Sequence, residues 1–184
     1  MREWLDDFYN SQTVRDSVLA SIGPLFTRYA EQVWRSEGGV GDLPSPFVSG
    51  LVAAYVAHHL DSSRIQLQEL LTAADPKAAI QERLAEWVET RPAKVAANET
   101  FRTANAIALE HLRSSGVTRK VWQSAGKSCP YCSHLNGRVV EIDKNFFEPG
   151  DSFHPEGAER SLTFTSNIGH PPVHRGCDCT IVGG

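Results

Sequence analysis

Apolar residues recur every three or four positions along roughly the first 115 residues, which is the spacing of one face of an α-helix. Gly23-Pro24 lies inside the first such stretch, and we expect proline to kink or split that helix because it lacks an N–H and clashes with the preceding turn. The apolar positions of this first stretch are Val14, Val18, Ile22, Phe26, Tyr29 and Val33.

Capping residues predict where the following helices begin. Ser45-Pro46 and Asp75-Pro76 each combine an N-cap with a proline at the first helical position. Asp61-Ser62-Ser63 caps another helix, and Pro92 restarts the pattern for a long last helix. Gly116 then stands where a left-handed C-cap residue belongs. The chain is therefore mostly helical as far as residue 115.

Alternation of apolar and polar residues after Gly116 predicts short strands at 117–122 and 138–142. Leu135-Asn136-Gly137-Arg138 is typical of a two-residue hairpin, and 179–182 can add a strand to an otherwise loop-like terminus. We therefore expect an α+β chain, with a mainly helical N-terminal domain at 1–115 and a small module at 116–184 that combines a β-hairpin with a cysteine knuckle. The pattern leaves open whether these two parts share one core.

Composition places the chain among soluble globular proteins. Of its 184 residues 41% are hydrophobic and 22% charged, and the formal net charge is −4. The acidic N-terminus has no apolar signal-peptide core, so we expect synthesis in the cytoplasm. The longest nearly apolar run, 47–57, is well short of the roughly 20 residues that cross a bilayer, so we expect no membrane span.

All four cysteines lie in the last third of the chain, which indicates a local metal site rather than a disulfide scaffold. A Cys-x-x-Cys pair and a His-x-x-Cys-x-Cys segment give five candidates for the four positions of a closed structural zinc site. The first pair should bind together with two of the other three residues. The alternative is that the two pairs form disulfides in an oxidising medium. The candidate ligands are Cys129, Cys132, His174, Cys177 and Cys179.

A basic stretch surrounds the first cysteine pair, with no Asp or Glu between residues 111 and 140. It can form a phosphate-binding patch, or its cations can stabilise the negatively charged zinc thiolates. We favour the second interpretation, because only Trp122 and Tyr131 interleave as base-stacking aromatics. The candidate nucleic-acid-binding residues are Arg113, Arg119, Lys120, Lys127 and Arg138.

Catalytic motifs are weak, and we expect no enzyme activity. His154-Pro155-Glu156 and the Cys-x-x-Cys pair suggest a zinc deaminase, but the H-x-E segment follows the cysteines instead of preceding them. The sequence has no G-x-S-x-G, H-E-x-x-H or P-loop. A nucleophilic pair of Cys132 with His134 or His174 stays open, although thiolates committed to zinc are poor nucleophiles.

The order of elements in the C-terminal half carries a family resemblance. They are Asn98-Glu99-Thr100 with Asn105, Trp122, the Cys-x-x-Cys pair, Leu135-Asn136-Gly137, Phe146-Phe147 and Pro171-Pro172-Val173-His174 with the last two cysteines. The run 95–182 resembles the phage Mu protein F-like minor head proteins, which act in head morphogenesis of tailed bacteriophages. This chain departs from their usual pattern at Arg175 and Asp178, and between Trp122 and Cys129.

The resemblance implies a low-copy structural protein of the capsid interior. Such a protein is assembled in the bacterial host cytoplasm, associates with the phage portal and with capsid or scaffolding proteins, and stays in the virion. Packaged DNA is a further candidate partner. The alternatives are a nucleic-acid-binding module near the packaging channel and a zinc-dependent hydrolase carried in the virion.

Overall fold

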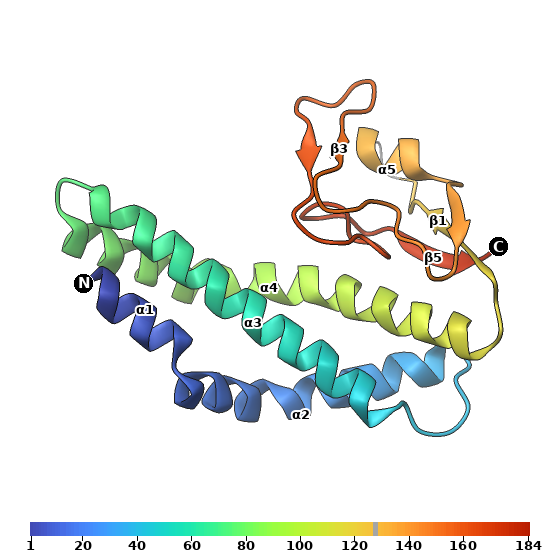
Figure 1. The fold of residues 1–184 in the computed structure, drawn as a ribbon, viewed down its shortest axis with the longest axis horizontal. Coiled ribbons are helices and arrows are strands. Elements are labelled where there is room, and N and C mark those ends of the chain that lie inside the picture. The colour runs from blue at the N-terminus through green and yellow to red at the C-terminus, as the bar shows by residue number, and fades with distance from the viewer. Residues whose placement is uncertain (127–128) are drawn as a thin grey trace. The chain divides into compact units, whose positions relative to one another are not determined.

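A computed structural model describes residues 1–126 and 129–184, and it consists of helices followed by short strands (Figure 1). The helices are α1 (Arg2–Asn10), α2 (Gln12–Ser36), α3 (Ser45–Glu69), the 3-10 helix η1 (Leu70–Thr72), α4 (Pro76–Ser114) and α5 (Pro130–Leu135). The strands are β1 (Arg119–Gln123), β2 (Val139–Glu141), β3 (Ser152–Phe153), β4 (Leu162–Thr163) and β5 (Thr180–Gly183). The expected α+β class is confirmed.

The chain forms two compact units, and their boundary differs from the expected one. Unit 1 comprises 1–32 and 40–94, and unit 2 comprises 33–39 and 95–184. The boundary thus falls inside α4 instead of at its end near residue 115. The second half of α4 belongs to unit 2 because Ala108 and Leu109 lie in the same buried cluster as residues of the β-strands.

The helix split expected at Pro24 and the helix starts expected at Pro92 and at 61–63 are wrong, whereas a kink at Pro24 stays a prediction. Pro24 lies inside α2, Pro92 inside α4, and 61–63 inside α3. A proline in a helix interior costs about 3 kcal/mol, so tertiary contacts must offset the loss. Next to Pro92 there is one such contact, because the Arg91 guanidinium of α4 donates to the Ser63 hydroxyl of α3 at 2.7 Å. None of the described helices is both long and apolar enough to cross a membrane.

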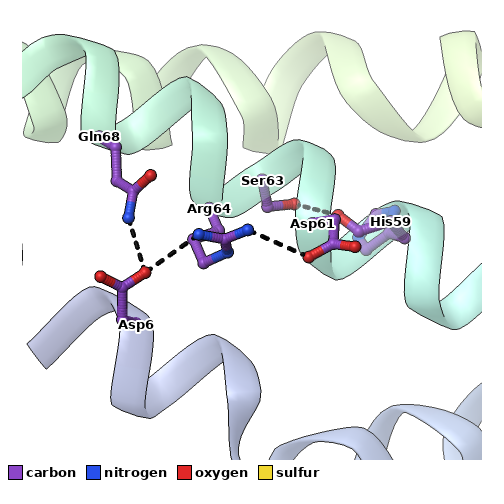
Figure 2. Close-up of polar contacts among 6 residues, drawn as sticks. All are labelled: Asp6, His59, Asp61, Ser63, Arg64 and Gln68. Atoms are coloured by element: carbon purple, nitrogen blue, oxygen red, sulfur yellow. Dashed lines mark hydrogen bonds and ion pairs between the residues drawn. The ribbon is translucent and has the colours of Figure 1, made fainter. Parts of the chain in front are cut away.

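Unit 1 is held together by one apolar face of α3 and by polar contacts at its end. Asp6 of α1 accepts hydrogen bonds from Arg64 at 3.0 Å and from Gln68 at 2.7 Å, both on α3 (Figure 2). Arg64 also contacts Asp61 at 3.4 Å, so one guanidinium spans two carboxylates. The buried apolar residues of this unit include Leu5, Ala30, Val48, Val52, Val56, Leu60 and Leu67.

Unit 2 contains a three-stranded antiparallel sheet in the order β2-β1-β5. Gly116 ends α4 with φ +75°, as expected for a left-handed C-cap, and β1 follows. β1 pairs Lys120 with Val140 of β2 and Trp122 with Ile181 of β5. β1 and β2 do pair, but the predicted two-residue hairpin between them is wrong, because α5 lies in the connection and ends where that turn was expected.

The core of unit 2 is aromatic and contains sulfur. Trp122 is fully buried and meets the Phe146 ring edge-on at 5.0 Å between centroids. The terminal segment expected to be loop-like also carries the short β3–β4 pair, which is antiparallel. The buried cluster comprises Ala108, Leu109, Trp122, Cys132, Leu135, Phe146, Phe147, Phe164, Val173, Cys177, Cys179 and Ile181.

Candidate metal centre

Two chain segments bring the five predicted ligands together. Cys129 stands at the N-cap of α5 in an extended conformation, and Pro130 begins the helix, so Cys132 lies within its first turn. The other segment makes a turn in which the N–H of Cys177 donates to the carbonyl of His174 at 3.2 Å. Gly176 allows this turn because its φ is +74°.

The ligand atoms lie at the separations of a metal site. Cys129 Sγ is 3.0 Å from His174 Nε2, and Cys132 Sγ is 3.4 Å from the same nitrogen. Cys132 Sγ is also 3.6 Å from Cys177 Sγ. The atoms form two overlapping triads, Cys129–Cys132–His174 and Cys132–Cys177–Cys179, with all distances inside each triad below 4.8 Å. Cys132 belongs to both triads and is therefore the centre of the cluster. These side chains could bind a metal ion.

Hydrogen bonding prepares His174 to act as a ligand. Its Nδ1 lies 2.8 Å from the backbone carbonyl of Arg175. A carbonyl oxygen only accepts, so Nδ1 carries the proton. The lone pair of a neutral imidazole is then on Nε2, the nitrogen that faces Cys129 and Cys132.

Burial and mutual contacts shift the thiols in opposite directions. The pKa of Cys132 is raised because its thiol donates to Cys177 and Cys179, with burial adding to the effect. The pKa of Cys179 is lowered to about 2, because Cys132 and Cys177 donate to its sulfur and Trp122 contributes more weakly. All four cysteines are free thiols. In the absence of a metal ion, the cluster therefore favours a thiolate at Cys179, and Cys132 and Cys177 keep their protons.

The indole N–H of Trp122 gives a further indication of what the site holds. It is buried and has no partner within ordinary hydrogen-bond limits among the described residues. It acts only as a weak, long hydrogen-bond donor toward Cys179, and in this way it helps to lower the pKa of that thiol. A buried donor of this kind is costly unless it faces negative charge, and metal-bound thiolates supply such charge. The donor set fits a thiophilic metal.

Two asparagines of α4 fix the backbone beside the cysteines. The Asn105 side-chain amide donates to the carbonyl of Cys179 at 3.0 Å and accepts from the N–H of Ile181 at 3.0 Å. These two groups lie on the side of β5 that does not pair with β1. Asn98 accepts from the N–H of Gly176 at 3.2 Å. The sequence analysis names both asparagines in the family resemblance but assigns them no role. The signal that could have revealed the role is a polar residue at an otherwise apolar position of the helix.

The predicted basic patch is only partly assembled. Lys120 is 1% exposed, and its ammonium donates to the carbonyl of Ile142 at 2.9 Å, so its prediction as a phosphate contact is wrong. Arg113 contacts Asp143 at 3.1 Å. Arg119 and Arg138 are exposed, and Lys127 lies outside the described residues. Side chains alternate between the two faces of a strand, so Lys120 lies on the same buried face of β1 as Trp122.

The other catalytic candidates are not brought into the cluster. His154 and Glu156 are exposed, and neither belongs to the two ligand triads. Within the described residues the five sulfur and nitrogen ligands thus stand as one group without a neighbouring carboxylate ligand. Comparisons with protein-family models, with curated proteins and with solved structures found no match.

Proposed function

We propose that the cluster binds one zinc ion through Cys129, Cys132, His174 and Cys177. Tetrahedral zinc with its usual bond lengths separates two sulfurs by about 3.8 Å and a sulfur from a nitrogen by about 3.6 Å. The contacts of 3.6 Å and 3.4 Å at Cys132 lie close to these values, whereas the 3.0 Å between Cys129 Sγ and His174 Nε2 is about 0.6 Å shorter and would lengthen when both bind one ion. Cys179 is left next to the ion, where its sulfur can accept from Trp122. Of the assigned ligands, Cys132 and Cys177 are buried and Cys129 and His174 are half-buried, which supports a structural rather than a catalytic ion.

Metal analysis of purified single variants tests this assignment. We expect one equivalent of zinc in the wild type and in Cys179→Ser, and less than half an equivalent in Cys129→Ser and Cys177→Ser. Ser133→Ala, on the exposed side of α5, is the control and should keep its zinc. Loss of zinc in Cys179→Ser with retention in Cys177→Ser would overturn the assignment. A His174→Ala protein that retains one tightly bound ion would instead indicate four cysteine ligands.

We also propose that the protein is a minor head protein of a tailed bacteriophage, which acts in head morphogenesis and associates with the portal inside the capsid. The observation that carries this proposal is the assembly of the resembling elements into one structural site. The two cysteine segments converge with His174, and Asn98 and Asn105 bind the backbone of the terminal segment. A zinc ion there would join the start of α5 to the terminal segment, which Asn98 and Asn105 bind to α4, so the arrangement supports a scaffold without requiring chemistry.

Assembly in the host tests the head-protein proposal. We expect deletion of the gene to reduce the yield of DNA-filled, infectious heads, and we expect the protein to copurify with the portal and to be found in mature virions. Complementation with wild type should restore the yield, whereas Cys129→Ser should not. Normal numbers of infectious heads after deletion would refute the proposal. A purified wild-type protein that hydrolyses nucleic acid or peptidoglycan only when zinc is bound would favour the hydrolase alternative.

A further inference from the structure

The donor atoms of the candidate metal centre fall into two triads that share only the sulfur of Cys132. The first triad is Cys129–Cys132–His174, and the second is Cys132–Cys177–Cys179. Donors around one tetrahedral zinc ion lie about 3.6–3.8 Å from one another, so they form a single group. Binding of one zinc ion must therefore draw donors from both triads together, whereas each triad by itself is already compact.

Three donors in a compact group suit Cu(I) better than zinc. Cu(I) is a soft ion that thiolates select, and imidazole also binds copper. Its filled d shell makes it stable with only two or three ligands. Bonds of about 2.3 Å in a three-coordinate plane place the donors about 4 Å apart. This separation fits within each triad, where every distance is below 4.8 Å.

The number of donors also matches two copper ions. Two three-coordinate ions that share one bridging thiolate need five donors, and the two triads together contain five. A single tetrahedral zinc ion uses four of them and leaves the sulfur of Cys179 without a metal. Cys132 occupies the place of the bridge, because it is the one residue common to both triads.

The surroundings of the donors shield a bound Cu(I) ion from water and oxygen. All three cysteines of the second triad are buried. The first triad is more open, but there the Tyr131 ring lies 5.5 Å from the His174 ring between centroids. The Tyr131 hydroxyl donates to the carbonyl of Arg160, which holds the ring in place. Such shelter slows oxidation and disproportionation of Cu(I), both of which need access from solvent.

We propose that the cluster binds two Cu(I) ions, one in each triad, with the sulfur of Cys132 bridging them. The ions enter in the reduced state, so no electron is transferred. Thiols that bind them release their protons to solvent, and a zinc ion already bound at the cluster is displaced. The inference adds a second metal-bound state to the cluster, and it does not depend on the proposed role in head morphogenesis.

Anaerobic titration of the reduced, full-length wild type with Cu(I), against a competing Cu(I) chelator, tests the inference. We expect the titration to break at two copper ions per chain and any bound zinc to be released by that point. X-ray absorption of the product should show about three sulfur or nitrogen neighbours per copper, together with a second copper nearby. A break at any other number of copper ions, or copper without a neighbouring copper, would overturn the inference.

Cys179→Ser distinguishes the second copper ion from the zinc site, because the zinc assignment leaves this sulfur unbound. We expect the variant to keep one equivalent of zinc, which also shows that it folds, and to bind the second copper at least tenfold more weakly than wild type. Ser133→Ala, on the exposed side of α5, is the control and should bind both ions as wild type does. Equal affinity for both ions in Cys179→Ser would overturn the second centre.

Failure of this inference differs from failure of the zinc proposal. A wild type that holds one zinc ion but saturates at one copper ion would overturn the two-copper state and leave the zinc site standing. Two copper ions in a protein that never retains zinc would support the inference and refute the zinc site. The wild-type titration decides both cases without any variant.

Discussion

Replacing Asn105 by leucine should destabilise unit 2 strongly, although the two side chains are close in size. Asn105 is 2% exposed, and its amide bonds the carbonyl of Cys179 and the N–H of Ile181. Leucine would leave both backbone groups buried without a partner. Each such group costs about 1–3 kcal/mol, so we expect a loss of about 4 kcal/mol. A typical domain is stable by only about 5–15 kcal/mol, which makes this a large fraction of the total.

Urea denaturation of the zinc-loaded full-length protein can measure this loss. Release of zinc to a colorimetric chelator reports on unit 2, because every candidate ligand lies there. Asn98→Ala is the comparison variant, since it removes a single, solvent-accessible hydrogen bond to Gly176 and should cost less than about 1 kcal/mol. If Asn105→Leu released zinc at a urea concentration as high as Asn98→Ala does, the amide would not be what holds β5 to α4.

Three further predictions concern glycine positions and buried titratable groups. Gly39→Ala should lower the free energy of unfolding by about 1–3 kcal/mol, because the added Cβ would clash with the Trp34 ring. Gly50→Ala should raise it by about 0.5–1 kcal/mol, because Gly50 lies in α3 with open space around it. Thermal unfolding of the two variants measures the difference. Burial lowers the pKa of His170 to about 4, so stability should fall as pH drops from 6.5 to 4, and His170→Asn should lose this dependence in acid titrations. Burial lowers the pKa of Lys120 to about 8, so stability should rise between pH 8 and 10.5 in the wild type but not in Lys120→Met; equal slopes would refute this.

The candidate metal ligands were predictable from the sequence because short spacings between cysteine and histidine residues are typical of metal sites. Cys129 and Cys132 must lie close together at two intervening residues, and so must His174 and Cys177. Which four of the five candidates bind the ion can be argued only from the three-dimensional structure. The proton on His174 Nδ1 and the contact between Cys132 and Cys177 depend on how two distant segments meet, which local sequence does not encode.

Helix boundaries were less predictable than helix existence. The rule that proline breaks a helix describes a local cost, and it gave wrong helix ends at Pro24 and Pro92, which lie inside α2 and α4. Tertiary context can override such local preferences. The Asn136-Gly137 signal was real as a turn, with φ +80° at Gly137, but it follows α5 rather than a strand. Lys120 shows the same limit, because alternation along β1 placed a lysine on the buried face.

The discontinuous make-up of unit 2 bears on how the gene can be divided for expression. A fragment that starts at residue 116 would contain all five candidate ligands, yet it would lack Asn98, Asn105 and the helix that carries them. A fragment that starts at residue 95 contains this part of the helix but still lacks 33–39, which also belongs to unit 2. Trp34 in that segment contacts the His111 ring edge-on, with ring centroids 5.4 Å apart. Any contiguous fragment that includes both parts of unit 2 must also include residues 40–94. The alternative to the intact chain is therefore to co-express one fragment that carries 33–39 with another that carries 95–184.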